Sequence, residues 1–331
     1  ILKKVGNLND FFTFACGRGW VTSNPIDESF MKSMRQLKIK AGKAKTSNHY
    51  DGFKPDDIRK IFDAKDYLDV NRKADYFWGP LISLHTGARL GEIATLTPHR
   101  IQYEKEADLH VFLMGRKNEN SVRKVPIAQN LIDIGLLDYW QWTLHNDAKF
   151  LFPHQPKTET QGETVGKNLT RNFSEYLKKI KIKKDAKVFQ SFRHTLVTKM
   201  HVKNVPIGDA MLIVGHAAQD GEERMSHSSD RQSGHPSNVH LDTYVHAEDF
   251  EEENQTYLMR LKAHIDKTLV YPINVSELRV AAQIILEHCT ASTVGGAKKF
   301  KSGWHTNNKK YSELIRKHLV DSILDKIPET P

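Results

Sequence analysis

Hydrophobic positions along the chain recur mostly at helical spacing, and in one stretch they alternate. Apolar residues at intervals of three and four predict helices over 54–62, 75–85, 89–96, 129–147 and 168–180. Shorter alternating runs predict three strands over 100–103, 109–114 and 122–127. The pattern therefore predicts a mainly α-helical α+β protein with one small antiparallel β-sheet.

The two ends of the chain differ in pattern from this middle part. Residues 1–40 are predicted to be helical with a break at Gly17-Arg-Gly19, and 41–53 form a polar, basic linker. Residues 248–263, 275–288 and 310–327 are three further predicted helices. We expect domains over 1–45 (with the linker), 46–250 and 251–331, and, since the chain begins Ile1-Leu-Lys-Lys, a segment upstream of it.

Composition narrows the class of partner. The 331 residues carry a net charge of +9, which favours an anionic polymer, with nucleic acid first. The two cysteines, Cys16 and Cys289, lie far apart without metal-ligand spacing, which fits a reducing compartment and no disulfide framework. Apolar runs stay short of the roughly 18 residues that a membrane span requires, so we expect a cytoplasmic protein.

The candidate chemistry lies in two basic motifs. Arg193 and His194 open an apolar helix within Phe189-Gln-Ser-Phe-Arg-His-Thr-Leu-Val-Thr198, and Gly215-His216 follows the next short helix. Arg89, in Thr86-Gly-Ala-Arg89, lies at a predicted bend between helices, with Glu92 placed to brace its guanidinium. An arginine offers a planar fork of donors to phosphate oxygens.

These motifs form an ordered series with three others. Thr86-Gly-Ala-Arg89, Lys117 before Val122-Arg-Lys-Val-Pro-Ile127, Phe192-Arg-His-Thr195, Gly215-His216 and Tyr244 resemble the tyrosine recombinase (phage integrase) family over about residues 51–248. The resemblance implies an integrase-type catalytic domain over 46–250, preceded by the end of a helical core DNA-binding domain. It also implies a site-specific recombinase of a phage or other mobile element, which cleaves and rejoins DNA through a covalent 3′-phosphotyrosine without metal, ATP or other cofactor.

The resemblance assigns a role to each site residue. Arg89 and Arg193 stabilise charge on the phosphate oxygens, Lys117 protonates the leaving oxygen, and Tyr244 attacks phosphorus. His216 is left with acid-base work. Family members usually carry a histidine where this chain has Gln190, which donates a hydrogen bond but carries no proton.

The distance between His216 and Tyr244 is a second departure. His216 lies 23 residues after Arg193, as the family requires, but Tyr244 follows 28 residues later, a much longer gap than usual. His235, which lies 9 residues before Tyr244, is the alternative. We favour His216, because it follows an apolar helix that ends in glycine, and we interpret 217–237 as an insertion. The nearby histidines match no zinc-ligand spacing, so no metal site is predicted.

Basic residues outside the motifs are candidate phosphate contacts, and each such contact makes affinity fall with salt. They are Lys43, Lys45, Arg116, Lys178, Lys179, Lys181, Lys183, Lys184, Lys187 and His194. The resemblance implies duplex DNA with inverted-repeat core sites, a tetramer on that DNA, accessory DNA-bending proteins and a place at the bacterial nucleoid. The 251–331 extension is expected to serve oligomerisation or DNA contact. The alternatives are a catalytically inactive DNA-binding relative, a type IB topoisomerase-like enzyme and a basic RNA-binding protein.

Overall fold

The structure is a computed structural model that describes residues 2–26, 28–30, 32–33, 51–115, 122–153, 165–182, 187–215, 251–268, 271–294 and 297–303. It divides the chain into two compact units, Ile1–His49 and Tyr50–Pro331. The boundary falls inside the stretch 41–53 that the sequence predicts as a linker.

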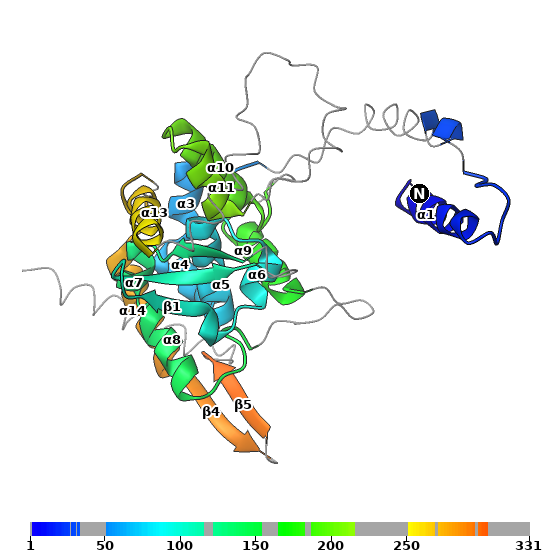
Figure 1. Cartoon of the computed structure of the whole chain (residues 1–331). Coiled ribbons are helices and arrows are strands. Elements are labelled where there is room, and N and C mark those ends of the chain that lie inside the picture. Colours follow the sequence, from blue (N-terminus) through cyan, green and yellow to red (C-terminus); the bar gives the residue numbers. More distant parts are fainter. Residues whose placement is uncertain are drawn as a thin grey trace, which may run out of the picture. The chain divides into compact units, whose positions relative to one another are not determined.

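The first unit is built on helix α1 (Leu2–Gly17) (Figure 1). The helix ends at Gly17, and the backbone N–H of Trp20 donates back to the carbonyl of Ala15 at 2.9 Å. The amide of Asn24 then donates to the side-chain oxygens of Asn9 and Thr13, both at 3.1 Å. The Asn-Pro turn is thereby tied to the helix that precedes it.

The second unit is organised around α5 (Ala74–Thr86), in which nearly every residue is buried. A helix that is buried on all sides must be covered on all sides. Helices α6 (Leu90–Ala94), α9 (Lys167–Lys179), α10 (Ser191–Val202) and α14 (Val275–Glu287) all contact it. α5 is therefore the centre of the core from which the flanking helices take their positions.

The antiparallel sheet has the order β1 (Ile101–Glu104), β2 (Leu109–Met114), β3 (Arg123–Pro126), and follows the short 3-10 helix η1 (Pro98–Arg100). Phe112 in the middle strand lies opposite Ile101 on one side and Val125 on the other. All three are buried. The three strands predicted from alternation are confirmed, each within one residue at either end.

An aromatic cluster fixes the start of α10. Phe192 lies 4.9 Å from Phe53, 5.1 Å from Phe173 and 5.8 Å from Phe189, measured between ring centroids. Helices α3 (Pro55–Ile61) and α4 (Ala64–Val70) add Phe62 and Tyr67 to the same core. The hydroxyl of Thr195 accepts the backbone N–H of Phe53 at 2.6 Å. α10 thus enters the core with its first turn held on several sides.

The single helix predicted over 129–147 is wrong in one respect. The structure has two helices there, α7 (Gln129–Ile134) and α8 (Leu136–His145), separated by Gly135. Gly135 has a φ of 105°, a left-handed conformation that other residues rarely adopt. The apolar spacing continues through this glycine, so periodicity alone did not reveal the break.

Described residues after position 250 pack into the same core. Helix α13 (Glu251–Ala263) continues into a π-helical turn η4 (His264–Thr268) and lies against β3. Arg260 makes a two-pronged ion pair with buried Asp209 on α11 (Ile207–Val214), with N–O distances of 3.0 Å. Leu261, Ile265, Leu278 and Ile285 are buried in the core of the unit.

The expectation of helices alone in this C-terminal part is corrected by a hairpin. Strands β4 (Cys289–Val294) and β5 (Ala297–Ser302) pair antiparallel and project beyond α8 in Figure 1. β-branched Thr290, Thr293 and Val294 before two glycines are strand and turn signals that point to this hairpin in the sequence. The helix predicted over 310–327 lies outside the described residues.

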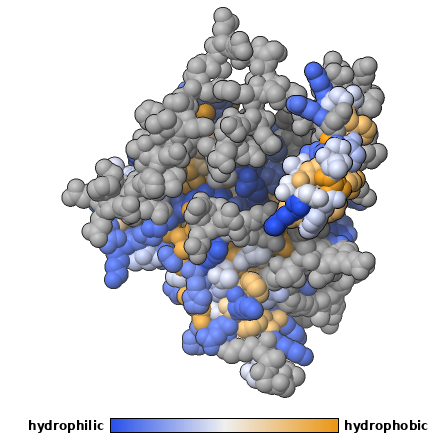
Figure 2. Space-filling view, turned by 45° about the vertical axis from the view of Figure 1, so that its right-hand side comes forward, coloured by the Kyte–Doolittle hydropathy of each residue, from blue (hydrophilic) through white to orange (hydrophobic). Residues whose placement is uncertain are grey.

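In the view of Figure 2, the described surface is largely hydrophilic, with hydrophobic residues in small patches. Among the described residues, no helix is both long and apolar enough to cross a membrane.

Candidate active site

Arg193 is the most deeply buried of the predicted site residues that the structure describes, with 5% of its surface exposed. It lies in the first turn of α10, directly after the aromatic anchor Phe192. Its Nη1 donates to the carbonyl oxygens of Gly87, at 2.7 Å, and Val214, at 2.5 Å. Its Nη2 is buried and has no hydrogen-bond partner among the described residues. One half of the guanidinium is thus anchored, and the other half keeps its donors.

Gly87 connects the Thr86-Gly-Ala-Arg89 motif to Arg193. It caps α5 in the left-handed conformation, with φ of 62°. A Cβ at this position would lie 2.9 Å from Leu196 Cδ2 and 3.1 Å from Val214 Cγ1, so both the backbone angle and the space favour glycine. The turn places the Gly87 carbonyl on Arg193, and α6 starts three residues later.

Arg89 lies at the N-terminal end of α6, with an exposed side chain. Its positive charge acts on Arg193. The pKa of Arg193 is lowered to about 10, first by burial and then by the charges of Arg89 and Arg123, while Glu92 opposes the shift. The structure therefore brings the two predicted arginines into one electrostatic environment, although 104 positions separate them in the chain.

Arg123 and Glu92 join this cluster through an ion pair that the sequence analysis did not predict. Arg123 Nη1 and Nη2 donate to the two Glu92 carboxylate oxygens at 2.9 and 3.3 Å. Only 10% and 7% of the two side chains is exposed. Burial alone would raise the pKa of Glu92, but the hydrogen bonds and charge of Arg123 and the Arg89 amide outweigh it and lower the pKa.

The expected partner of Glu92 is thereby corrected. Its carboxylate accepts the guanidinium of Arg123 and the backbone N–H of Arg89, the latter at 2.7 Å. The guanidinium of Arg89 is left on the exposed side. One signal was present: Arg123 shares a strand face with Val125, which is fully buried. An arginine on a buried strand face requires an acidic partner.

Gln190 and His194 flank Arg193. The backbone carbonyl of Gln190 accepts the N–H of Arg193 at 3.1 Å and caps the start of α10. Both side chains are partly exposed. Gln190 therefore lies at the start of α10, three residues before Arg193.

The remaining predicted site residues lie outside the described residues. They are Lys117, His216, His235 and Tyr244, together with the candidate DNA contacts Lys43, Lys45, Arg116, Lys183 and Lys184. The structure does describe the residue before His216: Gly215 caps α11 with φ of 66°.

The described part of the basic run 178–187 does not form one uniform surface. Lys178 and Lys181 are exposed, and Lys179 reaches Asp69 at 2.6 Å while remaining half exposed. Lys187, expected as a phosphate contact, is instead buried in an ion pair with Asp57 at 2.5 Å. Burial alone would raise the pKa of Asp57, but the hydrogen bond and charge of Lys187 lower it. A buried ammonium needs such a carboxylate, which removes it from the DNA-facing set.

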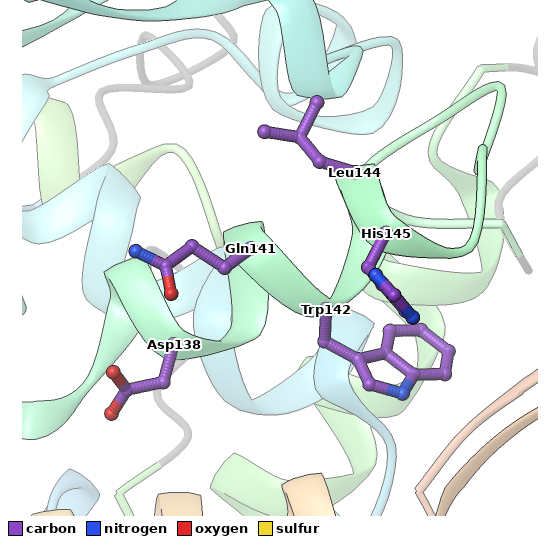
Figure 3. A pocket seen from close by; sticks show the side chains of 5 residues that line it. All are labelled: Asp138, Gln141, Trp142, Leu144 and His145. Atoms are coloured by element: carbon purple, nitrogen blue, oxygen red, sulfur yellow. The ribbon is translucent and has the colours of Figure 1, made fainter.

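A surface pocket of about 700 Å³ lies elsewhere, along α8 (Figure 3). Its lining residues are Asp138, Gln141, Trp142, Leu144 and His145. All five belong to one helix, and Asp138 is already paired with Arg279 at 2.7 Å. The pocket therefore shares no residue with the arginine cluster. Within the described ranges, no group of three or more potential metal ligands occurs.

The chain is similar to a known protein family. The model of the phage integrase family matches residues 51–230, more than half of the 331 residues. The match contains Arg89, Arg123 and Arg193, and also Gly87 and Val214, whose backbone carbonyls accept hydrogen bonds from Arg193. No curated protein and no solved structure matches the chain.

Proposed function

This chain belongs to the phage integrase family, and on that premise we propose that it is a site-specific DNA recombinase. It cleaves and rejoins DNA strands through a covalent 3′-phosphotyrosine, without ATP or a metal ion. The family acts on DNA, and the net charge of +9 fits a polyanionic partner.

The guanidinium of Arg193 carries this proposal. Its Nη1 is fixed by two backbone carbonyls, and its Nη2 is buried without a partner among the described residues. Buried donors are almost always satisfied, so an unpaired one suggests a missing ligand. Arg89 lies close enough to lower the pKa of Arg193. Among the described residues, Glu92 is the carboxylate that opposes the charges of these three arginines, so the cluster carries an excess of positive charge, which suits a phosphodiester.

Two guanidinium groups supply the positive charge and the hydrogen-bond donors that phosphoryl transfer requires. Charge accumulates on the non-bridging oxygens as phosphorus becomes five-coordinate, and preorganised donors stabilise that charge. Arg193 is preorganised because its anchored half cannot rotate away from Gly87 and Val214. Arg89 is exposed and approaches the same phosphate from the solvent side.

The proposed bond changes balance without a co-reactant. The phenol oxygen of Tyr244 attacks phosphorus, and the bond from phosphorus to the 5′-oxygen breaks. His216 accepts the phenol proton, with His235 as the alternative, and Lys117 protonates the leaving 5′-oxygen. A phenol has a pKa near ~10, so it needs this help at neutral pH. A 5′-hydroxyl of a partner strand then reverses the step and releases the tyrosine.

The assembly follows from the proposed reaction. Exchange between two duplexes requires four cleavages, which four protomers on inverted-repeat sites provide, with accessory DNA-bending proteins where the sites are distant. The exposed Lys178 and Lys181, at and just after the end of α9, are proposed phosphate contacts. In a bacterial cell such a protein works at the nucleoid.

An inactive DNA-binding relative is the second candidate. Gln190 favours it, because glutamine cannot transfer a proton where the family usually has histidine. A type IB topoisomerase-like enzyme would use the same chemistry, and relaxation of supercoiled plasmid by a monomer would distinguish it.

Covalent trapping tests the proposal. A pool of random duplexes, each with a nick that lets the leaving fragment diffuse away, is incubated with the protein, and the adduct is mapped by peptide sequencing. We expect an adduct at Tyr244 that Tyr244→Phe abolishes while DNA binding persists. Tyr257→Phe, on α13, is the matched control and should form the adduct. Binding without any adduct would support the inactive relative, and an adduct in Tyr244→Phe would show that another residue attacks.

A further inference from the structure

We propose that Arg123 is a positioning residue of the cleavage site. Its guanidinium holds in place both Arg89 and Gly215, the residue that precedes His216 in the chain. The inference rests on the proposed function and adds to it a residue that touches neither the phosphate nor the nucleophile.

The first connection runs through Glu92 to Arg89. Arg123 holds both Glu92 oxygens, at 2.9 and 3.3 Å, and one of these oxygens accepts the Arg89 backbone N–H at 2.7 Å. Glu92 also lies one turn into α6, so its carboxylate closes the helix start on which Arg89 sits. Any displacement of Glu92 would therefore move the residue that presents the exposed guanidinium.

The second connection runs to the end of α11. Arg123 Nε donates to the carbonyl of Ile213 at 3.1 Å, and Arg193 donates to the next carbonyl, that of Val214. The last carbonyls of a helix have no partners inside it, and cations are favourable there. Two arginines from different elements thus satisfy consecutive carbonyls directly before Gly215.

Gly215 makes this contact sensitive to geometry. It has φ of 66°, and an added Cβ would lie 2.5 Å from Arg123 Nη1 and 2.6 Å from Arg123 Cζ. The backbone therefore turns directly over the guanidinium, and His216 is the next residue in the chain. The position of Arg123 therefore constrains the backbone at Gly215, where α11 ends.

Arginine is required for this arrangement. Nε, Nη1 and Nη2 each have a separate acceptor, two on Glu92 and one on Ile213. A lysine has a single ammonium on a flexible stem and cannot reproduce a planar fork of three donors. The pair is also nearly buried, so loss of one partner leaves an uncompensated charge inside the protein.

The neighbouring residue offers a matched control. Lys124 is also on β3 and also forms a partly buried ion pair, with Glu104 at 3.3 Å. Successive strand residues point to opposite faces, so Lys124 faces away from α11. Loss of its charge removes an ion pair from the same strand without touching Arg89, Arg193 or Gly215.

The test compares Arg123→Gln, Arg123→Lys and Lys124→Gln with the wild-type chain on the duplex recovered by trapping. Three quantities are measured: stability in urea, affinity for the duplex, and the single-turnover rate of adduct formation at saturating DNA. We expect Arg123→Gln to slow adduct formation on the order of 100-fold, as a misplaced catalytic group does, while affinity is retained. Arg123→Lys should fall between this variant and wild type, and Lys124→Gln should keep the wild-type rate.

The outcomes separate the two proposals. A folded Arg123→Gln with the wild-type rate, or an equal loss in Lys124→Gln, would overturn the positioning role. If Arg123→Gln fails to fold, Arg123→Lys decides, and a wild-type rate in that variant would overturn the inference. Absence of an adduct with the wild-type chain would instead refute the proposed function.

Discussion

Arg193 illustrates how one side chain is held and left available at once. Its Nη1 satisfies two carbonyls from segments 127 positions apart in the chain, Gly87 and Val214. The same contacts bury its charge, and Glu92 with two further arginines sets the local field. The residue is thus a structural link and the proposed phosphate ligand together, so its substitution has two separable effects.

Arg193→Ala is expected to lose cleavage far more than affinity. Loss of a preorganised charged donor costs on the order of 100-fold or more in rate, whereas duplex affinity depends on many phosphate contacts. Rate and affinity are measured on the trapped duplex, with urea denaturation to confirm the fold. Equal losses of cleavage rate and of affinity would show that Arg193 contributes to DNA binding and not to the cleavage step.

His85 makes stability depend on pH. Burial lowers the pKa of His85 to about 4, against about 6.5 in an unfolded chain. At a pH between these two pKa values, His85 binds a proton in the unfolded chain but not in the folded chain. Stability therefore falls as pH decreases from about 6.5 to about 4. The free energy of unfolding is measured by urea denaturation at pH 7 and at pH 5. Its decrease between these pH values should be about 2 kcal/mol smaller in His85→Phe than in wild type. The same loss in both chains would contradict this reading of His85.

At the scale of elements, the alternation and helical spacing of apolar residues were sufficient to predict the three-stranded sheet and most helices. β2 was predicted with both ends correct, and α5 within one residue. Local pattern failed at Gly135, where one angle of 105° divides a continuous apolar pattern. After Glu287 the local pattern did contain strand and turn signals for the hairpin β4–β5, and the prediction of helices alone overlooked them.

The site was predictable to the extent that its residues form local motifs. Arg89 and Arg193 each stand in a recognisable stretch, and the structure places them in one cluster. The Arg123–Glu92 pair depends on how β3 lies against α6, 31 positions away in the chain, and no local pattern encodes that register. The burial of Lys187 has the same origin, since its partner Asp57 belongs to α3, 130 positions away in the chain.

The basic run 178–187 should divide into two kinds of residue. Lys181→Gln is expected to reduce the slope of log affinity against log salt by roughly 0.9, one phosphate contact. Lys187→Gln should leave the slope unchanged and lower stability, because Asp57 loses its buried partner. Binding measured across a salt series and urea denaturation of both variants check this. A lower slope in Lys187→Gln would place that lysine on the DNA-facing surface.

At the scale of the whole molecule, the second unit extends well beyond the family match. The match ends at residue 230, yet Leu261, Ile265, Leu278 and Ile285 are buried in the same core as α5. Ser302 Oγ donates to Asp75 at 2.8 Å, and both residues are fully buried. The described residues after 250 therefore complete the core of the second unit.

Removal of residues 251–331 should abolish cooperative unfolding of the remaining chain. Each large apolar side chain lost from a core costs about 2–5 kcal/mol, and several such losses exceed the roughly 5–15 kcal/mol by which domains are stable. Removal of residues 1–49, the separate unit, should leave one cooperative transition. The thermal unfolding of the two truncated chains is measured by calorimetry. A sharp transition in the chain that lacks residues 251–331 would contradict a shared core.

The central claim is that the guanidinium groups of Arg89 and Arg193 act on one phosphate. A methylphosphonate at the cleaved position of the trapped duplex removes one charged non-bridging oxygen there and leaves every other phosphate in place. The measurement is the rate of adduct formation by wild type, Arg89→Ala and Arg193→Ala on both duplexes. We expect each variant to lose far less rate, relative to wild type, on methylphosphonate than on phosphate. The same fold-loss on the two duplexes would show that the arginines do not stabilise charge on that phosphate.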